Sequence, residues 1–346
     1  MTVPTRRFGS TGLQIPIFSC GGMRYQQSWK AEDTITPDNQ ANLEATIRRS
    51  VELGLNHIET ARGYGTSEEQ LGHVLPTFQR DKIIVQTKVG PEASADEFLR
   101  NFDVSMKKLK LDYVDLFGLH GINNRERLDW SLKKGGCGEA ALKLKEQGRI
   151  RHLGFSTHAA CDVIVEAIHS GLFEYVNLHW YYVFQDNWPA VEAATRRDVG
   201  VFIISPSDKG GKLYAPAAKF SQLCAPLSPI VFNDLFCLSK PEVHTLSIGA
   251  SRPSDFDEHL KVLPLLADAD RHLKPILARL EEALVKTLGR DWLASWKKGL
   301  PAWEKMPGQV NAREILRLRN LALAFDMVEY GKMRYNMLGN GDHWFP

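Results

Sequence analysis

Residues 83–120 have the sequence IIVQTKVGPEASADEFLRNFDVSMKKLKLDYVDLFGLH. The stretch begins and ends with a short apolar run, at residues 83–88 and 113–120. Between them, residues 97–109 carry apolar side chains at the spacing of an amphipathic helix. Two strands joined by a helix form a βαβ unit, in which the strands pair in parallel. The stretch therefore predicts an α/β fold built on a parallel sheet.

The same alternation continues on both sides of this stretch. Short runs rich in Ile, Val, Leu and Phe occur at residues 15–20, 57–60, 83–88, 113–120, 152–156, 175–179, 201–205 and 245–249. Amphipathic segments of helical length separate most of them, at residues 40–53, 97–109, 139–147, 161–170 and 189–198. Eight repeated units predict a closed (β/α)8 TIM barrel, which we assign to a first domain, residues 1–262.

The remaining residues, 263–346, lack the alternation typical of strands. Their pattern predicts helices at residues 273–288, 292–298 and 312–334. The segment also contains more aromatic residues than a disordered tail usually carries, namely Trp292, Trp296, Trp303 and Trp344. We therefore expect a helical C-terminal extension that packs on the barrel.

Composition excludes several classes of protein. The chain has 43 basic and 41 acidic side chains with interspersed signs, so no basic surface for nucleic acid or an anionic membrane is indicated. The five cysteines are odd in number and contain no C-x-x-C pair, which argues against a disulfide framework or an iron–sulfur cluster. No signal peptide and no apolar run of about 18 residues is present. These features predict a cytoplasmic protein.

Two familiar site motifs fail their context tests. Residues 136–141 nearly match the dinucleotide fingerprint, but no buried strand precedes them and no acidic partner follows. The pair His57 and Glu59 suggests a metal site, yet no H-x-H or H-E-x-x-H element is present. A metal-dependent barrel hydrolase stays the less favoured alternative, and we predict no bound metal.

Polar or ionisable side chains end almost every predicted strand. They are Glu59, Lys88, His120, Ser156, Asn177, His179, Ser205 and Ser247. The carboxyl ends of barrel strands converge on one mouth, where barrel enzymes carry their active sites. We therefore expect these side chains to surround a catalytic centre.

Residues 54–72, GLNHIETARGYGTSEEQLG, add a tyrosine to this group. Tyr64 lies in a glycine-flanked loop after the strand that ends in Glu59, and Ser67 with Gln70 predicts a capping box for the next helix. An ammonium such as that of Lys88, at about 4 Å and an effective dielectric constant of about 20, would attract a phenolate by about 4 kcal/mol. That attraction would lower the pKa of Tyr64 by up to about three units before desolvation opposes it. Tyr64 is therefore a candidate general acid.

Taken together, these segments resemble the aldo-keto reductase superfamily. The resemblance is carried by residues 54–72 and by five shorter segments, Arg7–Leu13, Cys20–Met23, Gly154–Thr157, Ser205–Pro206 and Ile248–Arg252. Arg7–Leu13 is similar to the opening hairpin of the family. It implies a catalytic tetrad of Glu59, Tyr64, Lys88 and His120, with Glu59 where the family usually has Asp. It also implies reduction of an aldehyde or ketone by hydride from a nicotinamide cofactor, with Tyr64 protonating the developing alkoxide. We expect a Glu59–Lys88 ion pair with Tyr64 beside the ammonium.

The resemblance also implies the cofactor-binding residues. They are Gly22, Met23, Ser156, Asn177, Ser205, Ser251, Arg252, Glu258 and His259. NADPH is expected rather than NADH, which stays possible, because Ser251 and Arg252 stand where the family binds the adenosine 2′-phosphate. Asp255, one turn further along the chain than Arg252, carries the opposite charge. Departures from the family pattern are Asn177 for Gln, Thr157 for Asn, His259 for Asn, and Ile204 for a stacking aromatic residue.

The substrate is expected to be a small-molecule carbonyl compound in a mostly apolar pocket built from loops. The predicted lining residues are Tyr25, Trp29, Trp180 and Phe184, although Trp180 could instead pack at the barrel rim. Residues 334–341 resemble the end of a subgroup with a cysteine-rich, ferredoxin-like tail, but no cysteine follows Cys237, so no iron–sulfur cluster is expected. The alternative function is a non-catalytic, nucleotide-binding sensor or subunit with the same barrel. The oligomeric state is not predicted.

Overall fold

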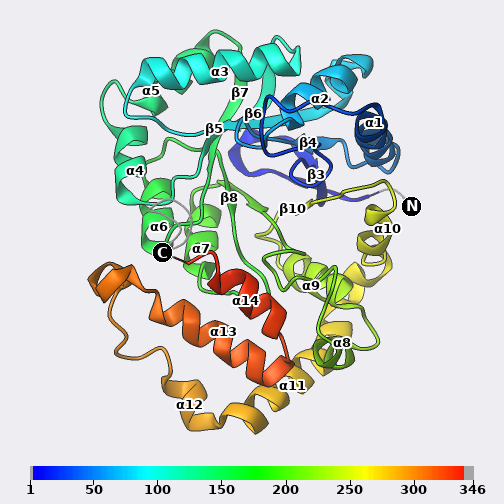
Figure 1. The fold of residues 1–346 in the computed structure, drawn as a ribbon, viewed down its shortest axis with the longest axis vertical. Coiled ribbons are helices and arrows are strands. Elements are labelled where there is room, and N and C mark those ends of the chain that lie inside the picture. The colour runs from blue at the N-terminus through cyan, green and yellow to red at the C-terminus, as the bar shows by residue number, and fades with distance from the viewer. Residues whose placement is uncertain (1–2, 339–346) are drawn as a thin grey trace. The chain divides into compact units, whose positions relative to one another are not determined.

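The structure is a computed structural model and describes residues 3–338. A closed barrel of parallel strands forms the centre of the first part of the chain, in the order β10-β3-β4-β5-β6-β7-β8-β9 (Figure 1). The strands are β3 (Phe18–Gly21), β4 (His57–Glu59), β5 (Ile84–Val89), β6 (Val114–His120), β7 (Ile150–Ser156), β8 (Tyr175–Leu178), β9 (Gly200–Ile203) and β10 (Thr245–Ile248). Each coincides with a predicted apolar run to within a few residues. The predicted (β/α)8 barrel is therefore confirmed.

Helices alternate with these strands along the chain, and those that precede β9 lie around the outside of the barrel (Figure 1). They are α1 (Pro37–Glu52), α2 (Ser67–Val74), α3 (Ala95–Leu109), α4 (Arg125–Leu132), α5 (Cys137–Glu146), α6 (Cys161–His169), α7 (Trp188–Arg196), α8 (Ala218–Cys224), α9 (Pro229–Leu238) and α10 (Asp255–Leu260). Helix α3 shows how the sequence sets where a helix begins and which side of it is buried. Ser94 caps its first turn by accepting a hydrogen bond from the Glu97 amide, and its buried residues include Phe98, Phe102 and Met106.

The predicted capping box at α2 is wrong. Thr66 is the N-cap residue, and Ser67 is already helical. The Ser67 hydroxyl instead forms a hydrogen bond of 2.8 Å with Thr60 Oγ1. The Gln70 side chain accepts from the Thr66 hydroxyl at 2.8 Å. The Ser67 and Gln70 side chains are therefore engaged by Thr60 and Thr66 and not by a reciprocal capping box.

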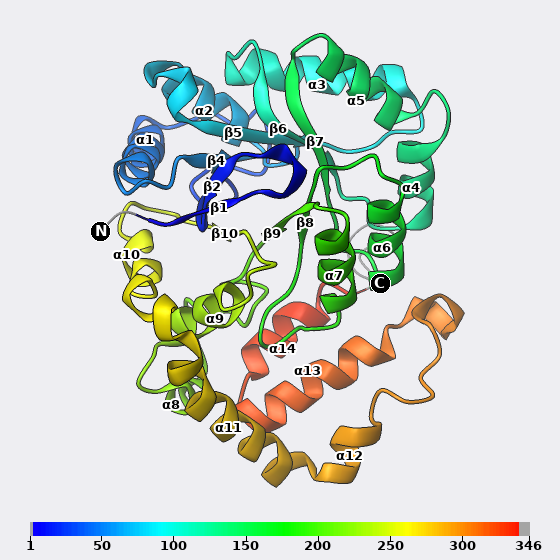
Figure 2. The same cartoon turned by 180° about the vertical axis from the view of Figure 1, so that it is seen from behind.

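An N-terminal hairpin of β1 (Thr5–Arg7) and β2 (Gln14–Pro16) precedes the barrel (Figure 2), as the resemblance implies. Phe8, in the turn of this hairpin, is fully buried in a cluster with Ile15, Leu116, Tyr175 and Phe202. The ring lies so close to the backbone of β9 that a Cβ added at Gly200 would be 2.6 Å from Phe8 Cδ2. The hairpin is thus packed directly against the strands.

The register of the strands aligns the predicted site residues. Glu59 pairs with Gln86, Lys88 with Gly118, His120 with Ser156, and Ser156 with Asn177. Successive strands therefore place these side chains along the carboxyl edge of the barrel. The site described below lies at this edge.

The described residues group into two compact units. Of the described residues, the first contains the barrel strands and residues 3–179, 186–205 and 241–258, and the second contains residues 180–185, 206–240 and 259–338. These units do not follow the boundary at residue 262, and the division into domains 1–262 and 263–346 stays a prediction.

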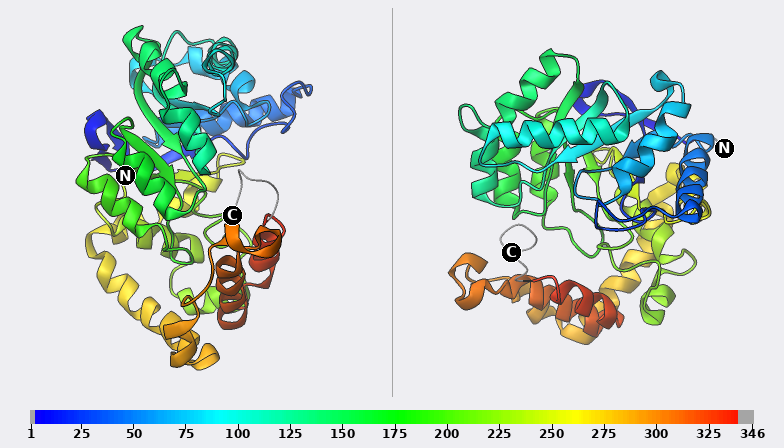
Figure 3. Two further views of the ribbon diagram at one scale, coloured as in Figure 1. Left: turned by 90° about the vertical axis from the view of Figure 1, so that its left-hand side faces the viewer. Right: turned by 45° about the horizontal axis from the view of Figure 1, so that its top comes forward.

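The second unit contains the C-terminal helices α11 (Ala269–Leu288), α12 (Arg290–Ser295), α13 (Ala312–Phe325) and α14 (Val328–Tyr335). Helix α13 packs against both α11 and α14, as Figure 3 shows. The single helix predicted at residues 312–334 is interrupted, because Asp326 takes a left-handed conformation with φ of 59°. Within residues 3–338, no helix has both the length and the apolar character needed to cross a lipid bilayer.

Candidate active site

The centre of the candidate site is an ion pair between two neighbouring strands. Lys88 Nζ donates to Glu59 Oε1 and also to the Thr60 carbonyl oxygen, at 2.7 Å. Only 1% of the Lys88 side chain and 4% of the Glu59 side chain are exposed. Burial lowers the pKa of Lys88 well below its usual value. The expected Glu59–Lys88 ion pair is confirmed, and the extra methylene of Glu does not prevent it.

Tyr64 lies beside this pair. Its hydroxyl donates to Glu59 Oε1 at 3.4 Å, and Lys88 Nζ is 4.8 Å from the centre of its ring. Removal of water from the hydroxyl raises the pKa of Tyr64. Desolvation, which opposes the attraction of the ammonium, therefore dominates, and the pKa of Tyr64 is raised rather than lowered. The phenol keeps its proton at neutral pH and can act as a donor.

His120 and Trp29 complete an aromatic wall around Tyr64. The His120 ring lies 5.6 Å from the Tyr64 ring in an edge arrangement, and the Trp29 ring lies 6.3 Å away in the same manner. Trp29 is 59% exposed, so this side of the site is open to solvent.

The buried amide of Asn177 fits a nicotinamide cofactor. Asn177 is fully buried, and neither its Oδ1 nor its Nδ2 has a hydrogen-bond partner in the structure. A buried amide without partners is unfavourable by about 1–3 kcal/mol per group, which indicates that a ligand supplies them. Ser156, its register neighbour, accepts from the Gly121 amide at 3.1 Å. A carboxamide is the complementary group for Asn177.

Gly22 leaves little room for a side chain. A Cβ at Gly22 would be 2.6 Å from the Glu59 carbonyl oxygen and 3.0 Å from the Tyr25 hydroxyl. Met23, next in sequence, is half-buried. Tyr25 itself is only 1% exposed, so the structure does not place it at a pocket surface as predicted.

The segment after β9 has an unusual backbone. Ser205 has a φ of 52°, a left-handed conformation that non-glycine residues adopt at an energetic cost. Ile204, before it, donates its amide to the Leu178 carbonyl at 3.0 Å. Such strain is concentrated at functional sites, which agrees with the predicted cofactor role of Ser205.

Ser251 and Arg252 follow β10, and both contact Asp255 of α10. Asp255 Oδ2 accepts from the amide and the hydroxyl of Ser251, at 2.9 and 2.8 Å. Asp255 Oδ1 accepts from Arg252 Nε at 3.1 Å. The opposing charge noted in the sequence is thus in direct contact with both predicted phosphate-binding residues. Glu258, on the same helix, is half-buried.

Three predicted site residues lie in the second unit and have packing roles there. His259 is fully buried, with its Nδ1 2.6 Å from Asp234 Oδ2, so its ring offers no surface to an adenine and the predicted contact is not supported. Trp180 is 2% exposed and stacks on Phe236 at 4.9 Å, which matches the packing alternative. Phe184 is half-buried, 5.2 Å from the guanidinium of Arg317. The predicted substrate roles of Trp180 and Phe184 stay untested.

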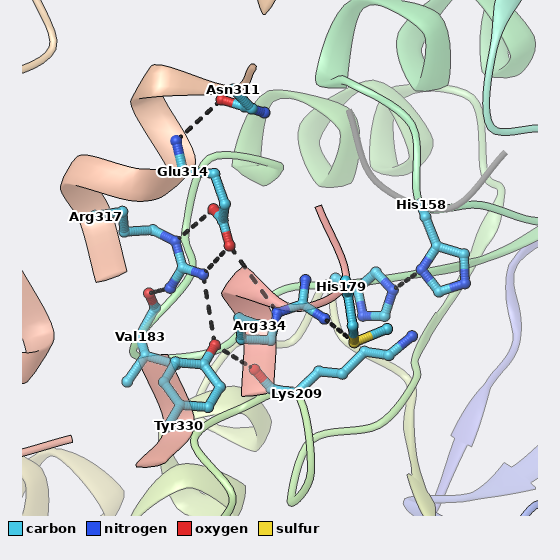
Figure 4. A network of polar contacts seen from close by, with 10 residues as sticks. His158, His179, Val183, Lys209, Asn311, Glu314, Arg317, Tyr330 and Arg334 are labelled. Carbon is cyan, nitrogen blue, oxygen red and sulfur yellow. Dashed lines mark hydrogen bonds and ion pairs between the residues drawn. The ribbon is translucent and has the colours of Figure 1, made fainter. Parts of the chain in front are cut away.

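Two polar clusters lie outside the predicted tetrad (Figure 4). In the second unit, Arg317 donates to Glu314 at 2.8 and 2.5 Å and to the Val183 carbonyl at 2.7 Å. In the first unit, His179 Nε2 lies 2.6 Å from His158 Nδ1. The sequence places both histidines near strand ends, and their contact with each other is what it does not predict. The arginine cluster has no such sequence signal.

No group of three or more His, Cys, Asp or Glu side chains that could hold a metal ion occurs within residues 3–338.

Comparison with known proteins places this arrangement in context. The sequence model of the Aldo/keto reductase family matches residues 18–211. L-galactose dehydrogenase of Arabidopsis thaliana is 27% identical over 217 residues, which are 59% of this chain and 65% of that protein. L-glyceraldehyde 3-phosphate reductase of Escherichia coli O157:H7 is 25% identical over 182 residues, which are 47% of this chain and 49% of that protein. The chain thus spans less than two thirds of the length of both relatives.

Solved structures share the same fold. An aldo-keto reductase from Klebsiella pneumoniae, in complex with NADPH, superposes with a TM-score of 0.61 at 19% sequence identity. The superposition covers 78% of this chain and 95% of that chain.

Proposed function

The chain belongs to the aldo/keto reductase family, and from this premise we propose that it is an NADPH-dependent oxidoreductase that reduces an aldehyde or ketone to an alcohol. The observation that carries the proposal is the contact of Tyr64 with the buried Glu59–Lys88 pair. An ion pair withdrawn from water next to a phenol at the barrel mouth is an arrangement for proton transfer. A purely structural ion pair would not need a tyrosine hydroxyl beside it.

In the proposed reduction, each residue of the tetrad would have a separate role. The nicotinamide cofactor, when bound, supplies the hydride. Tyr64 donates its proton to the substrate oxygen as negative charge develops there, and Lys88 stabilises the phenolate that remains. Glu59 holds Lys88 in position, and His120 offers a second polar contact to the substrate oxygen.

Several residues support binding of the nicotinamide cofactor. Asn177 and Ser156 would hold the carboxamide, and Gly22, Met23 and Ser205 would line the same site. Ser251 and Arg252 would contact the adenosine end, where a guanidinium suits a 2′-phosphate. The preference for NADPH rests on these two residues. The similar Klebsiella pneumoniae structure contains NADPH.

The substrate is proposed to be a small carbonyl compound. Trp29, exposed beside Tyr64, is the candidate lining residue that the structure supports best. The names of the two relatives describe enzymes of sugars or sugar phosphates, so hydroxylated aldehydes belong in the first test panel. A cytoplasmic location is proposed with this function.

The first prediction concerns Tyr64. Tyr64→Phe removes the hydroxyl and keeps the ring, so reduction of every accepted aldehyde should fall by at least about a hundredfold while NADPH still binds. The measurement is NADPH oxidation with a carbonyl panel, combined with NADPH binding by fluorescence titration. The matched control is Tyr113→Phe, a tyrosine that lies between Arg80 and Arg151 before β6.

Two results would contradict the proposal in different ways. If the unmodified protein binds NADPH and reduces no carbonyl compound, the non-catalytic sensor is the better description. If Tyr64→Phe keeps full turnover, another group is the acid.

A further inference from the structure

Asp255 is the centre of a compact charged cluster at the carboxyl end of β10. It accepts three hydrogen bonds, two from Ser251 and one from Arg252. Arg24, from the loop after β3, lies 3.7 Å from Asp255 Oδ2 and donates to the Gly249 carbonyl at 2.7 Å. Only 10% of the Asp255 side chain is exposed, against 71% for Arg252. The carboxylate is therefore the inner member of the cluster and the guanidinium the outer one.

The contacts keep Asp255 ionised. Desolvation acts to raise the pKa of this carboxyl, but the hydrogen bonds from Ser251 and Arg252 outweigh it and hold the pKa below its usual value. At neutral pH the donors of Ser251 and Arg252 are therefore directed at a full negative charge that belongs to the protein.

The charges around the cluster nearly cancel. Helix α10 carries Asp255, Asp257 and Glu258 in its first turn. Three guanidiniums face this region, those of Arg24, Arg252 and Arg49, the last of which lies 3.4 Å from Asp257. A ligand phosphate would thus enter a region without a net positive charge, although it would find suitable donors there.

We propose that Asp255 is a cofactor-selectivity residue, which competes with the adenosine 2′-phosphate for Ser251 and Arg252 and so limits the preference for NADPH over NADH. The inference rests on the proposed function, in which Ser251 and Arg252 face the adenosine 2′ position. A carboxylate repels a phosphate, whereas it can accept a hydrogen bond from the 2′-hydroxyl of NADH. The chain would consequently bind both cofactors. It would favour NADPH, but the ratio of the two affinities would be smaller than Ser251 and Arg252 would give without Asp255.

A positioning role makes the opposite prediction. If Asp255 served mainly to orient Arg252 toward the phosphate, neutralising it would loosen the guanidinium and weaken binding of phosphorylated ligands. If it competes with the phosphate, neutralising it strengthens that binding. The sign of the change separates the two roles.

The test is Asp255→Asn, which keeps the shape and an acceptor oxygen and removes the charge. Calorimetric titration would measure dissociation constants for 2′,5′-ADP, 5′-AMP, NADPH and NADH at low and at high salt. We expect affinity for the two ligands with a 2′-phosphate to rise about tenfold, equal to about 1.4 kcal/mol, while the other two change less than twofold. The rise should shrink at high salt, because the phosphate would bind beside the 71% exposed Arg252, where added ions screen the interactions between charges.

Asp257→Asn is the matched control, since it removes the same charge from the same helix two residues away. Its carboxylate pairs with Arg49 and is 58% exposed, so a gain of less than about threefold is expected. An Asp255→Asn variant whose affinity for 2′,5′-ADP falls or stays constant would overturn the inference, as would an equal gain in both variants. If the unmodified protein binds neither NADPH nor NADH, the proposed function itself is wrong, and the inference with it.

Discussion

Glu59 is expected to influence proton donation by Tyr64 through the pKa of the neighbouring Lys88. Its carboxylate is the counter-charge of Lys88, whose pKa burial already lowers well below the usual value. Glu59→Gln keeps an acceptor oxygen and removes the charge, so the pKa of Lys88 should fall further. The ammonium would then be lost at a lower pH, and the alkaline limb of the turnover profile should move to lower pH. Turnover at pH 7 should drop by about tenfold, equal to about 1.4 kcal/mol of barrier.

The measurement is turnover against pH for the unmodified protein and for Glu59→Gln. Glu59→Asp restores the charge on a shorter side chain and should recover the alkaline limb. Full turnover with an unshifted profile in Glu59→Gln would remove the carboxylate from the mechanism and leave Tyr64, Lys88 and His120.

At the scale of elements, the hairpin depends on a strand glycine. Gly200 begins β9, and a Cβ there would lie 2.6 Å from Phe8 Cδ2. Gly200→Ala must therefore displace a fully buried ring, and the free energy of unfolding should fall by about 1–3 kcal/mol in urea titrations. Gly331→Ala in α14 is the control, since its Cβ would be 3.9 Å from the nearest atom, the Leu318 carbonyl oxygen. It should be neutral or stabilise the helix by up to about 1 kcal/mol. Equal changes in the free energy of unfolding for the two variants would show that the Phe8 ring can be displaced at little cost.

At the scale of the whole molecule, acid stability depends on a buried histidine. His57 is fully buried with its Nδ1 2.6 Å from Ser19 Oγ, and burial lowers its pKa to about 3. In an unfolded chain the pKa of histidine is about 6.5, so between pH 6.5 and 3 the unfolded state binds the extra proton. The free energy of unfolding should therefore fall on acidification by up to about 1.4 kcal/mol per pH unit from this group.

Urea unfolding at pH 7 and pH 5 measures this contribution. His57→Gln should lose less stability between the two pH values than the unmodified protein loses. His169→Gln, at an exposed position on α6, should keep the full loss. An undiminished pH dependence in His57→Gln would assign the acid sensitivity to other groups.

The sequence alone determined the barrel and the centre of the candidate site. Both follow from local patterns, because strand and helix periodicities are properties of neighbouring residues. Glu59, Lys88 and His120 could be grouped before any coordinates were known, since the carboxyl ends of barrel strands must meet at one mouth. The substitution of Glu for Asp was compatible with the ion pair for the same reason, as the strands bring the two side chains together regardless of one methylene.

Only the tertiary structure decided which polar and aromatic side chains face the site. Tyr25 and Trp180 follow strand ends like the catalytic candidates, yet both are buried by packing. His259 pairs with Asp234, 25 positions earlier, on another helix. The pKa of Tyr64 rises because burial removes water from its hydroxyl. Burial and long-range pairing depend on every element that covers a residue, and this information is not contained in the spacing of the residues along the chain.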